Sequence, residues 1–130
     1  MVEENKVLVM DIDGTICEIK PKEKTYLEIL PKKDVVEKLR EYREKGFYII
    51  LYTARQMRTY SGNLGKINAN TAKVLFEWLE LHNIPYDEII FGKPWCGRAG
   101  FYVDDKAIRP SEFVNLSYEE ILTLIGNEEK

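Results

Sequence analysis

The stretch VLVMDIDGT at residues 7–15 decides the fold, because its four apolar residues run directly into a pair of aspartates. An apolar run without polar alternation is typical of a strand in a parallel sheet, where both faces are covered. Further runs of this kind lie at residues 47–52, 89–91 and 101–103. We therefore predict four strands, each followed directly by polar residues.

Helical periodicity fills the intervals between these runs. We predict one helix over residues 32–45 and another that begins near a cap at Asn70 or Thr71. The residues SYEE at 117–120 have the spacing of a capping box and predict a last helix that ends at Gly126. Alternating strands and helices favour βαβ units, so the predicted fold class is α/β. The expected architecture is a three-layer, Rossmann-like sandwich with a mainly parallel sheet.

The chain has the size and composition of one domain, residues 1–130. Hydrophobic residues make up 45% of it and charged residues 32%, the balance of a globular protein that folds without disulfides or zinc. We expect Cys17 and Cys96 to be free thiols because their spacing matches no metal site. A short flap at residues 16–31 and a substrate loop at residues 53–69 fit no regular element.

Charge and hydropathy together lead us to expect a cytoplasmic protein. The 22 acidic residues exceed the 19 basic ones, which gives a net charge of −3. This balance disfavours non-specific binding to nucleic acid or to an anionic membrane. No apolar run reaches the roughly 18 residues of a bilayer span, and residues 1–6 lack the pattern of a secretory signal. We expect no nucleic-acid partner and no membrane partner.

Side chains that can take part in catalysis or in ligand binding follow each apolar run. They are Asp11, Asp13, Thr53, Lys93, Asp104 and Asp105. Ligands of open α/β sheets bind beyond the carboxyl ends of the strands, so we expect these residues at one edge. Clustered carboxylates need a cation, and an all-oxygen set suits Mg²⁺, while a lysine and a hydroxyl complete a cage for phosphoryl oxygens. One carboxylate is then free to attack phosphorus, and a second can transfer the proton.

Taken alone, each of these residues has an ordinary structural explanation. Asp13-Gly14 is typical of a turn, Thr53 could cap a helix, and Lys93 could be a solvated loop residue. A calcium-binding EF-hand loop that begins at Asp11 is excluded because its twelfth position is Lys22 rather than glutamate. Their occurrence in order, each directly after an apolar run, favours the functional interpretation.

In this order the residues resemble the haloacid dehalogenase superfamily of phosphohydrolases. Its first motif, DxDGT, matches residues 11–15, and its second, a threonine or serine after a strand, matches Thr53. Its third motif, a lysine, matches Lys93, and its fourth, an acidic pair, matches Asp104-Asp105. The motifs span residues 7–105, so the resemblance covers essentially the whole chain.

The resemblance implies a Mg²⁺-dependent phosphomonoester hydrolase with an aspartyl-phosphate intermediate. Asp11 would be the nucleophile and Asp13 the general acid/base. Asp11, the backbone carbonyl of Asp13 and Asp104 would hold Mg²⁺, with Asp105 acting through water. Acidic pairs vary within the superfamily, so the resemblance leaves open whether Asp104 or Asp105 touches the metal.

Three stretches look more specifically like a small capless branch, whose members accompany bacterial capsule and surface-polysaccharide biosynthesis. They are YTAR at 52–55, FGKPW at 91–95 and FYVDDKAI at 101–108. About forty residues separate successive pairs of the first three motifs, and helices are predicted in much of that length, so no cap domain fits. This likeness implies a phosphorylated sugar or polysaccharide-precursor metabolite as substrate. It also implies a homo-oligomer, because capless relatives often complete their sites by oligomerising.

Basic and aromatic residues near the motifs are candidates for holding the rest of an anionic substrate. Residues 53–76 contain no acid, and a positive loop beside a phosphate site attracts anions, although a merely solvated loop remains the alternative. Arg55 is expected to bind a second phosphate or a carboxylate bidentately. Trp95 and Arg98 could frame a sugar or base, but core packing explains Trp95 equally well. The predicted substrate-binding residues are Gly14, Thr15, Arg55, Arg58, Lys66, Trp95 and Arg98.

Other functions compete with this one. A receiver domain, which is a non-enzymatic phosphotransfer module, needs its acceptor aspartate after a middle strand and its lysine last. Here Lys93 precedes Asp104-Asp105, and no aspartate follows the run at residues 47–52. A polynucleotide-end phosphatase is a further alternative, against which the acidic charge and the lack of a basic, aromatic stripe weigh. A silent scaffold is disfavoured because every catalytic position is filled.

Overall fold

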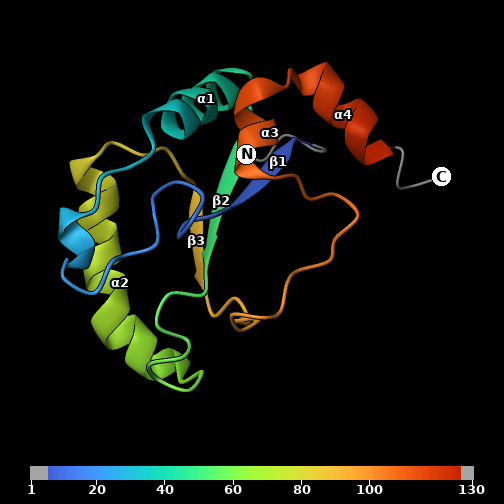
Figure 1. The fold of residues 1–130 in the computed structure, drawn as a ribbon. Coiled ribbons are helices and arrows are strands. Elements are labelled where there is room, and N and C mark those ends of the chain that lie inside the picture. Colours follow the sequence, from blue (N-terminus) through green and yellow to red (C-terminus); the bar gives the residue numbers. More distant parts are fainter. Residues whose placement is uncertain (1–5, 127–130) are drawn as a thin grey trace. The chain divides into compact units, whose positions relative to one another are not determined.

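Within the described residues up to Trp95, three strands form a parallel sheet (Figure 1). The strands, hydrogen-bonded in this order, are β1 (Val7–Asp11), β2 (Tyr48–Thr53) and β3 (Glu88–Phe91). Asp11 pairs with Tyr52, and Thr53 pairs with Phe91, so the strands end at a common carboxyl edge. The computed structural model describes residues 6–126 and confirms the first three predicted strands.

The chain forms two compact units, Met1–Trp95 and Cys96–Lys130, and each is described by itself. Besides the sheet, the first unit contains η1 (Tyr26–Glu28), α1 (Lys33–Glu44) and α2 (Leu64–Leu81). α1 confirms the helix predicted over residues 32–45. Among residues 6–126, no helix combines the length and the apolar character that crossing a bilayer requires.

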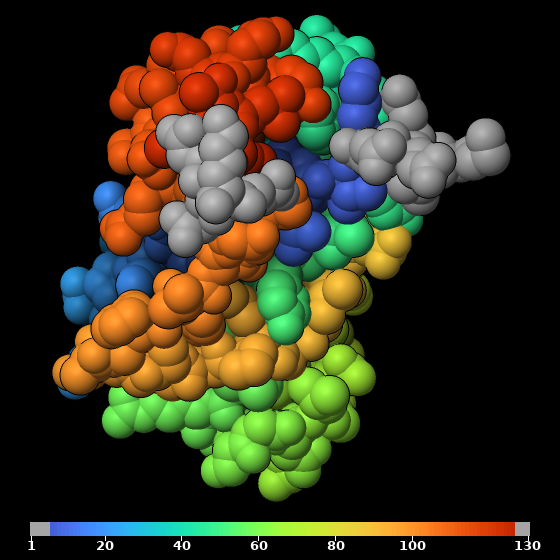
Figure 2. Space-filling view, turned by 90° about the vertical axis from the view of Figure 1, so that its right-hand side faces the viewer, coloured from blue at the N-terminus to red at the C-terminus, as the bar shows by residue number. Residues whose placement is uncertain are grey.

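Helices α1 and α2 pack on the same side of the sheet (Figure 1). Their buried residues are Val35, Val36, Leu39, Tyr42, Ile67, Thr71, Ala72, Leu75, Trp78 and Leu79. Burial alternates along β2, where Ile49 and Leu51 are fully buried and their neighbours in the strand are half-buried. On the opposite face Val9 is 57% exposed and Ile90 is 43% exposed. In a space-filling view, atoms of the blue segment that contains β1 reach the surface (Figure 2). Residues 6–95 therefore form two layers, whereas the uniformly apolar strands predict cover on both faces.

In the second unit, the described residues 96–126 form helices α3 (Pro110–Asn115) and α4 (Tyr118–Gly126). α4 begins with the predicted capping box. The Ser117 N–H donates to the Glu120 carboxylate at 2.8 Å, and the Ser117 hydroxyl accepts from the Glu120 N–H at 3.1 Å. These reciprocal bonds satisfy donors that the first turn of a helix leaves without partners.

The prediction of a fourth strand at residues 101–103 is wrong. Residues 96–109 contain no strand, and the side chains of Phe101 and Val103 are 79% and 87% exposed. Gly100 stands directly before this run and weakens its preference for extended backbone, whereas the equally short run at residues 89–91 pairs with β2.

α2 begins at Leu64, about two turns before the predicted cap at Asn70 or Thr71. Asn63 is the actual cap, and its side chain accepts a hydrogen bond from the Lys66 N–H at 3.1 Å. The first two turns are largely polar, so hydrophobic periodicity does not reveal them, and only Ile67 is fully buried there. The predicted substrate loop at residues 53–69 is therefore helical from residue 64 onward.

Replacing Asn63 by alanine is expected to destabilise the protein by about 1 kcal/mol, because the Lys66 N–H loses its side-chain acceptor. Urea unfolding followed by circular dichroism measures this change. Asn68→Ala is the matched control, because Asn68 is an exposed residue within the same helix. The control should be neutral or slightly stabilising, since alanine is the better helix former. Equal destabilisation by the two variants would contradict the cap.

Candidate active site

Asp11, the last residue of β1, and Asp13, in the loop that follows, lie at the carboxyl edge of the sheet. Ile12, between them, is fully buried, and both aspartates are partly exposed. The Ile12 carbonyl accepts the N–H groups of Thr15, Ile16 and Cys17 at 3.1, 2.9 and 3.3 Å, which folds the loop into a tight turn. Gly14 has a φ of +86°, a conformation that side-chain-bearing residues rarely adopt, so the turn depends on glycine here.

Asp11 is paired with the lysine that follows β3. The Lys93 Nζ lies 3.5 Å from one Asp11 oxygen, and the Thr15 hydroxyl donates to the other at 3.5 Å. Burial raises the pKa of the Asp11 carboxyl; the charge of Lys93 opposes this shift and the charge of Asp13 adds to it. The Asp11 carboxyl group thus lies in a partly desolvated place, where a nearby positive charge favours its ionised form.

Gly92 sets the direction of the chain that carries Lys93. Its φ is +92°, and a Cβ at this position would lie 2.7 Å from Cδ2 of Leu64, the first residue of α2. The Lys93 N–H donates to the Thr53 carbonyl at 3.1 Å, which continues the pairing of β3 with β2 by one residue. A side chain at residue 92 would therefore strain the backbone that leads to Lys93, and the end of the Leu64 side chain would have to move aside.

Asp13 is held by Thr53, the last residue of β2, and by Arg55, which follows that strand. Arg55 Nη2 lies 2.8 Å from Asp13 Oδ1, and Arg55 Nε lies 3.3 and 3.2 Å from Oδ1 and Oδ2. The Thr53 hydroxyl donates to Asp13 Oδ2 at 3.3 Å and accepts the Arg55 N–H at 2.9 Å. Thr53 is fully buried and Arg55 is only 5% exposed. The expected second-phosphate role of Arg55 stays a prediction, but its guanidinium lies on Asp13.

Tyr26, in the flap, is the site residue that sequence reasoning missed. Its ring centre lies 4.1 Å from the Arg55 guanidinium carbon, and burial and the charge of Asp13 both raise the pKa of its hydroxyl. Residues 16–31 offer only weak alternation, which does not say which side chain turns inward. The sole available signal was an aromatic residue among charged ones, and that signal is not specific.

Cys17 is a free thiol, as expected, and it packs beside these carboxylates. Its sulfur lies 3.8 Å from the Ile12 carbonyl oxygen and 3.9 Å from Asp13 Oδ1. Burial, together with the negative charge of Asp13, raises the pKa of the thiol to about 12. Cys17 and Cys96 are both free cysteines, and Cys17 is fully buried whereas Cys96 is partly exposed.

A thiol reagent such as Ellman's reagent is expected to react quickly with one cysteine of the folded protein, Cys96, and with both after unfolding. The thiolate is the reactive form, and burial and the raised pKa keep Cys17 as the neutral thiol. Cys96→Ser should remove the fast phase, while Cys17→Ser should leave it in place. A fast phase that survives Cys96→Ser would show that Cys17 is accessible.

Of the other predicted residues, Gly14 and Thr15 take part in the turn and the contacts described above, and the rest are exposed or lie in the second unit. Gly14 and Thr15 belong to the loop after β1, and Arg58 and Lys66 are exposed residues of the first unit. Trp95, where that unit ends, is 47% exposed. The second unit carries Arg98, Asp104 and Asp105, all exposed. Asp104 accepts the Lys106 N–H at 2.9 Å.

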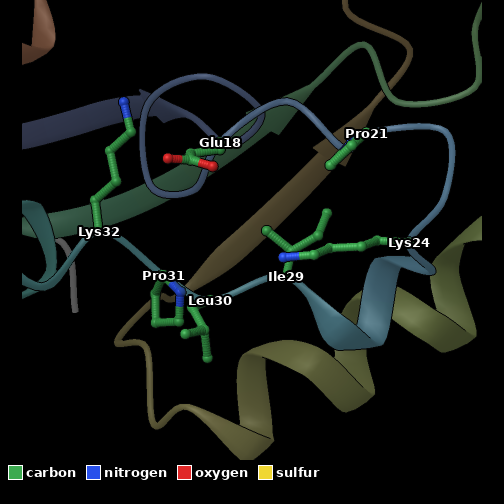
Figure 3. A pocket seen from close by; sticks show the side chains of 7 residues that line it. All are labelled: Glu18, Pro21, Lys24, Ile29, Leu30, Pro31 and Lys32. Atoms are coloured by element: carbon green, nitrogen blue, oxygen red, sulfur yellow. The ribbon is translucent and has the colours of Figure 1, made fainter.

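A shallow pocket of about 260 Å³ lies in the flap (Figure 3). It is lined by Glu18, Pro21, Lys24, Ile29, Leu30, Pro31 and Lys32. Lys32 Nζ donates to the Gly14 carbonyl at 3.3 Å, which ties the pocket rim to the turn after Asp13. The pocket contains none of the predicted substrate-binding residues.

Asp11 and Asp13 fit part of a magnesium site. They offer oxygen ligands from the end of β1 and the turn after it, and the desolvated Asp11 carboxylate favours a nearby cation. Across residues 6–126, no three His, Cys, Asp or Glu side chains gather into a metal-binding group. The predicted contribution of Asp104 and Asp105 stays a prediction.

Solved structures show what this chain is similar to. The crystal structure of an MCSG target from Vibrio cholerae is 52% identical, with 95% of this chain and 98% of that chain covered and a TM-score of 0.90. A structure of the Pnkp1/Rnl/Hen1 complex is 19% identical over 85% of this chain and 34% of that chain, with a TM-score of 0.48. No protein-family model and no curated protein matches the chain. The 52% identity to the Vibrio cholerae protein, over nearly the full length of both chains, shows that this chain belongs to the same family as that protein.

Proposed function

We propose that this chain is a Mg²⁺-dependent phosphomonoester hydrolase of the haloacid dehalogenase type. The observation that supports it best is the Asp11–Lys93 pair at 3.5 Å, with Asp13 two residues along, at the carboxyl edge of a parallel sheet. This edge is where open α/β sheets bind ligands. The order of the motifs and their resemblance to that superfamily supply the rest of the support.

In the proposed reaction an Asp11 oxygen attacks phosphorus, and the bond from phosphorus to the leaving oxygen breaks. Asp13 gives its proton to that oxygen, so the alcohol leaves neutral. Water then attacks the aspartyl phosphate, Asp13 takes a proton from the water, and phosphate leaves with Asp11 restored. Lys93 offsets the negative charge that the phosphoryl group brings beside Asp11.

Asp11, the backbone carbonyl of Asp13 and one of Asp104 and Asp105 would hold Mg²⁺. When bound, Mg²⁺ would screen the charge between nucleophile and phosphate and polarise a phosphoryl oxygen. Asp11 and Lys93 have separate roles in this scheme. The Asp11 carboxylate supplies the attacking oxygen, and the Lys93 ammonium group holds that carboxylate in place.

The proposed substrate is a phosphorylated sugar or a polysaccharide-precursor metabolite, bound by a cytoplasmic homo-oligomer without a cap domain. The acid-free stretch at residues 53–76 carries exposed Arg58 and Lys66, which favour an anionic ligand. Light scattering measures the oligomeric state. A strict monomer would contradict that part of the proposal and leave the phosphatase chemistry standing.

Incubating the purified protein and Mg²⁺ with a panel of phosphomonoesters tests the proposal. The panel contains sugar phosphates, amino-alcohol phosphates, nucleotides and 3′-phosphorylated oligonucleotides, and released phosphate is measured. We expect Mg²⁺-dependent turnover, fastest with a sugar phosphate and abolished by EDTA. Preference for oligonucleotides would support the polynucleotide-end alternative, and no turnover with any ester would overturn the proposed function.

Lys93→Ala and Asp104→Ala are expected to lose activity in different ways. Without Lys93 the phosphate and Asp11 lose a balancing charge, and added Mg²⁺ does not replace it. Without Asp104 the proposed metal site is weakened, so high Mg²⁺ should restore part of the rate. Magnesium titrations of the steady-state rate separate the two. Titration curves of the same form for both variants would contradict this division of roles.

A further inference from the structure

Arg55 lies behind the proposed proton-transfer residue. Its side chain is 2% exposed, whereas the side chain of Asp13 is 24% exposed. Of this pair, only Asp13 is open to a ligand that arrives from solvent. The arrangement suits a residue that acts through Asp13 better than one that binds a distal phosphate.

The contact between the two side chains fixes an orientation as well as a distance. Two nitrogens of the planar guanidinium lie on the carboxylate, Nη2 at 2.8 Å and Nε at 3.2 and 3.3 Å. The Thr53 hydroxyl adds a further donor to the same group at 3.3 Å. Donors on both oxygens hold the plane of the Asp13 carboxyl group.

Arg55 is itself held firmly. The Tyr26 ring lies against its guanidinium at 4.1 Å, and its backbone N–H donates to the Thr53 hydroxyl at 2.9 Å. Gln56, the next residue, has a φ of +58°, and its side chain accepts a hydrogen bond from the Thr71 hydroxyl of α2. Left-handed backbone is uncommon outside glycine, so α2 and the flap together constrain where Arg55 points.

A contribution to folding stability does not explain why an arginine is buried at position 55. Within residues 6–126, Arg55 Nη1 is buried and has no hydrogen-bond partner. Leaving a buried charged donor without a partner costs free energy, and buried ion pairs often add no net stability over apolar residues. An apolar side chain of the same size would fill the volume without that cost.

We propose that Arg55, stacked on Tyr26, is a positioning residue that orients the Asp13 carboxyl group toward the leaving-group oxygen of the ester. This inference rests on the proposed function, in which Asp13 transfers the proton. A catalytic group misplaced by about 1 Å can lose on the order of 100-fold in rate. Esters that need a proton on the leaving oxygen should therefore depend on Arg55 most.

The test compares two esters of nearly equal shape, phenyl phosphate and p-nitrophenyl phosphate. Phenolate is the poorer leaving group and gains more from protonation. Arg55→Ala and the charge-keeping Arg55→Lys are expected to lower kcat/KM for phenyl phosphate by roughly 10- to 100-fold, with a much smaller fall for p-nitrophenyl phosphate. Within the stacked pair, Tyr26→Leu should show this bias more strongly than Tyr26→Phe, which keeps the ring.

A double-mutant cycle shows whether Arg55 acts through Asp13. In an Asp13→Asn background, Arg55→Ala should produce little further loss with phenyl phosphate, because the group that Arg55 orients is already absent. Arg43→Ala is the matched control. It removes an Arg–Asp contact of 2.7 Å, with Asp87, at the amino-terminal edge of the sheet, away from the site.

The outcomes are separable. Selective loss with phenyl phosphate that disappears in the Asp13→Asn background supports the inference. Equal loss with both esters, additive losses in the cycle, or faster turnover after Arg55→Ala would overturn it while leaving the phosphatase proposal intact. A wild type that hydrolyses neither these esters nor any ester of the panel would overturn both.

Discussion

Asp11→Asn is expected to remove phosphomonoester turnover, lowering kcat by a factor on the order of 10⁴ or more, as loss of a nucleophile does in other enzymes. The amide keeps the shape of the carboxylate but is a poor nucleophile, and it also breaks the ion pair with Lys93 at 3.5 Å. Steady-state phosphate release in the presence of Mg²⁺ measures the loss. Acid quenching and mass spectrometry of the wild type should find a phosphoryl group on the peptide that contains Asp11.

Asp34→Asn is the control for this substitution, because Asp34 is an exposed aspartate in the first turn of α1. It should retain the wild-type rate. An Asp11→Asn variant that keeps more than a few per cent of activity, or a phosphoryl group found on a different aspartate, would remove Asp11 from the nucleophile's role.

Asp13→Asn is expected to slow hydrolysis by about 10²- to 10⁴-fold, the usual range for general acid–base catalysis. The amide carries no proton to give and takes none from water, so both half-reactions suffer. The fall in kcat/KM should be smaller for p-nitrophenyl phosphate, whose leaving group needs little protonation. Comparing that ester with phenyl phosphate measures the difference.

Equal falls for the two esters would show that Asp13 has a structural role, holding Arg55 and the turn. The fold offers such a role, since the carboxylate accepts from both Arg55 and the Thr53 hydroxyl. Unfolding experiments on Asp13→Asn therefore accompany the kinetics, so that a loss of folded protein is not mistaken for a loss of catalysis.

The regular elements with strong periodicity could be predicted from the sequence. Strand β1, strand β2 and helix α1 carry apolar runs or stripes long enough to identify their type. α4 was found from the capping box, since both partners lie three residues apart. Because polar residues lie at or just beyond the carboxyl ends of β1, β2 and β3, the sequence also predicts Asp11, Asp13, Thr53 and Lys93 at one edge.

What could not be predicted depends on contacts between residues far apart in the sequence. Nothing local says that Arg55 turns back onto Asp13, forty-two residues earlier, rather than outward to solvent. The stacking of Tyr26 on that guanidinium is equally non-local. The start of α2 could not be predicted because its first two turns, which include Gly65 and Lys66, are too polar to show helical periodicity. Asn63, its cap, precedes them.

Ile12 makes the spacing of the two aspartates a property of the core. It is fully buried, while the residues on either side of it are partly exposed. A one-residue shift within this stretch would turn both carboxylates inward and the isoleucine outward. Such a shift would cost the protein its fold before it cost any catalysis. An insertion or deletion in this stretch would therefore prevent folding. The alternation that points Asp11 and Asp13 toward the site is thus maintained by the same packing that keeps Ile12 in the core.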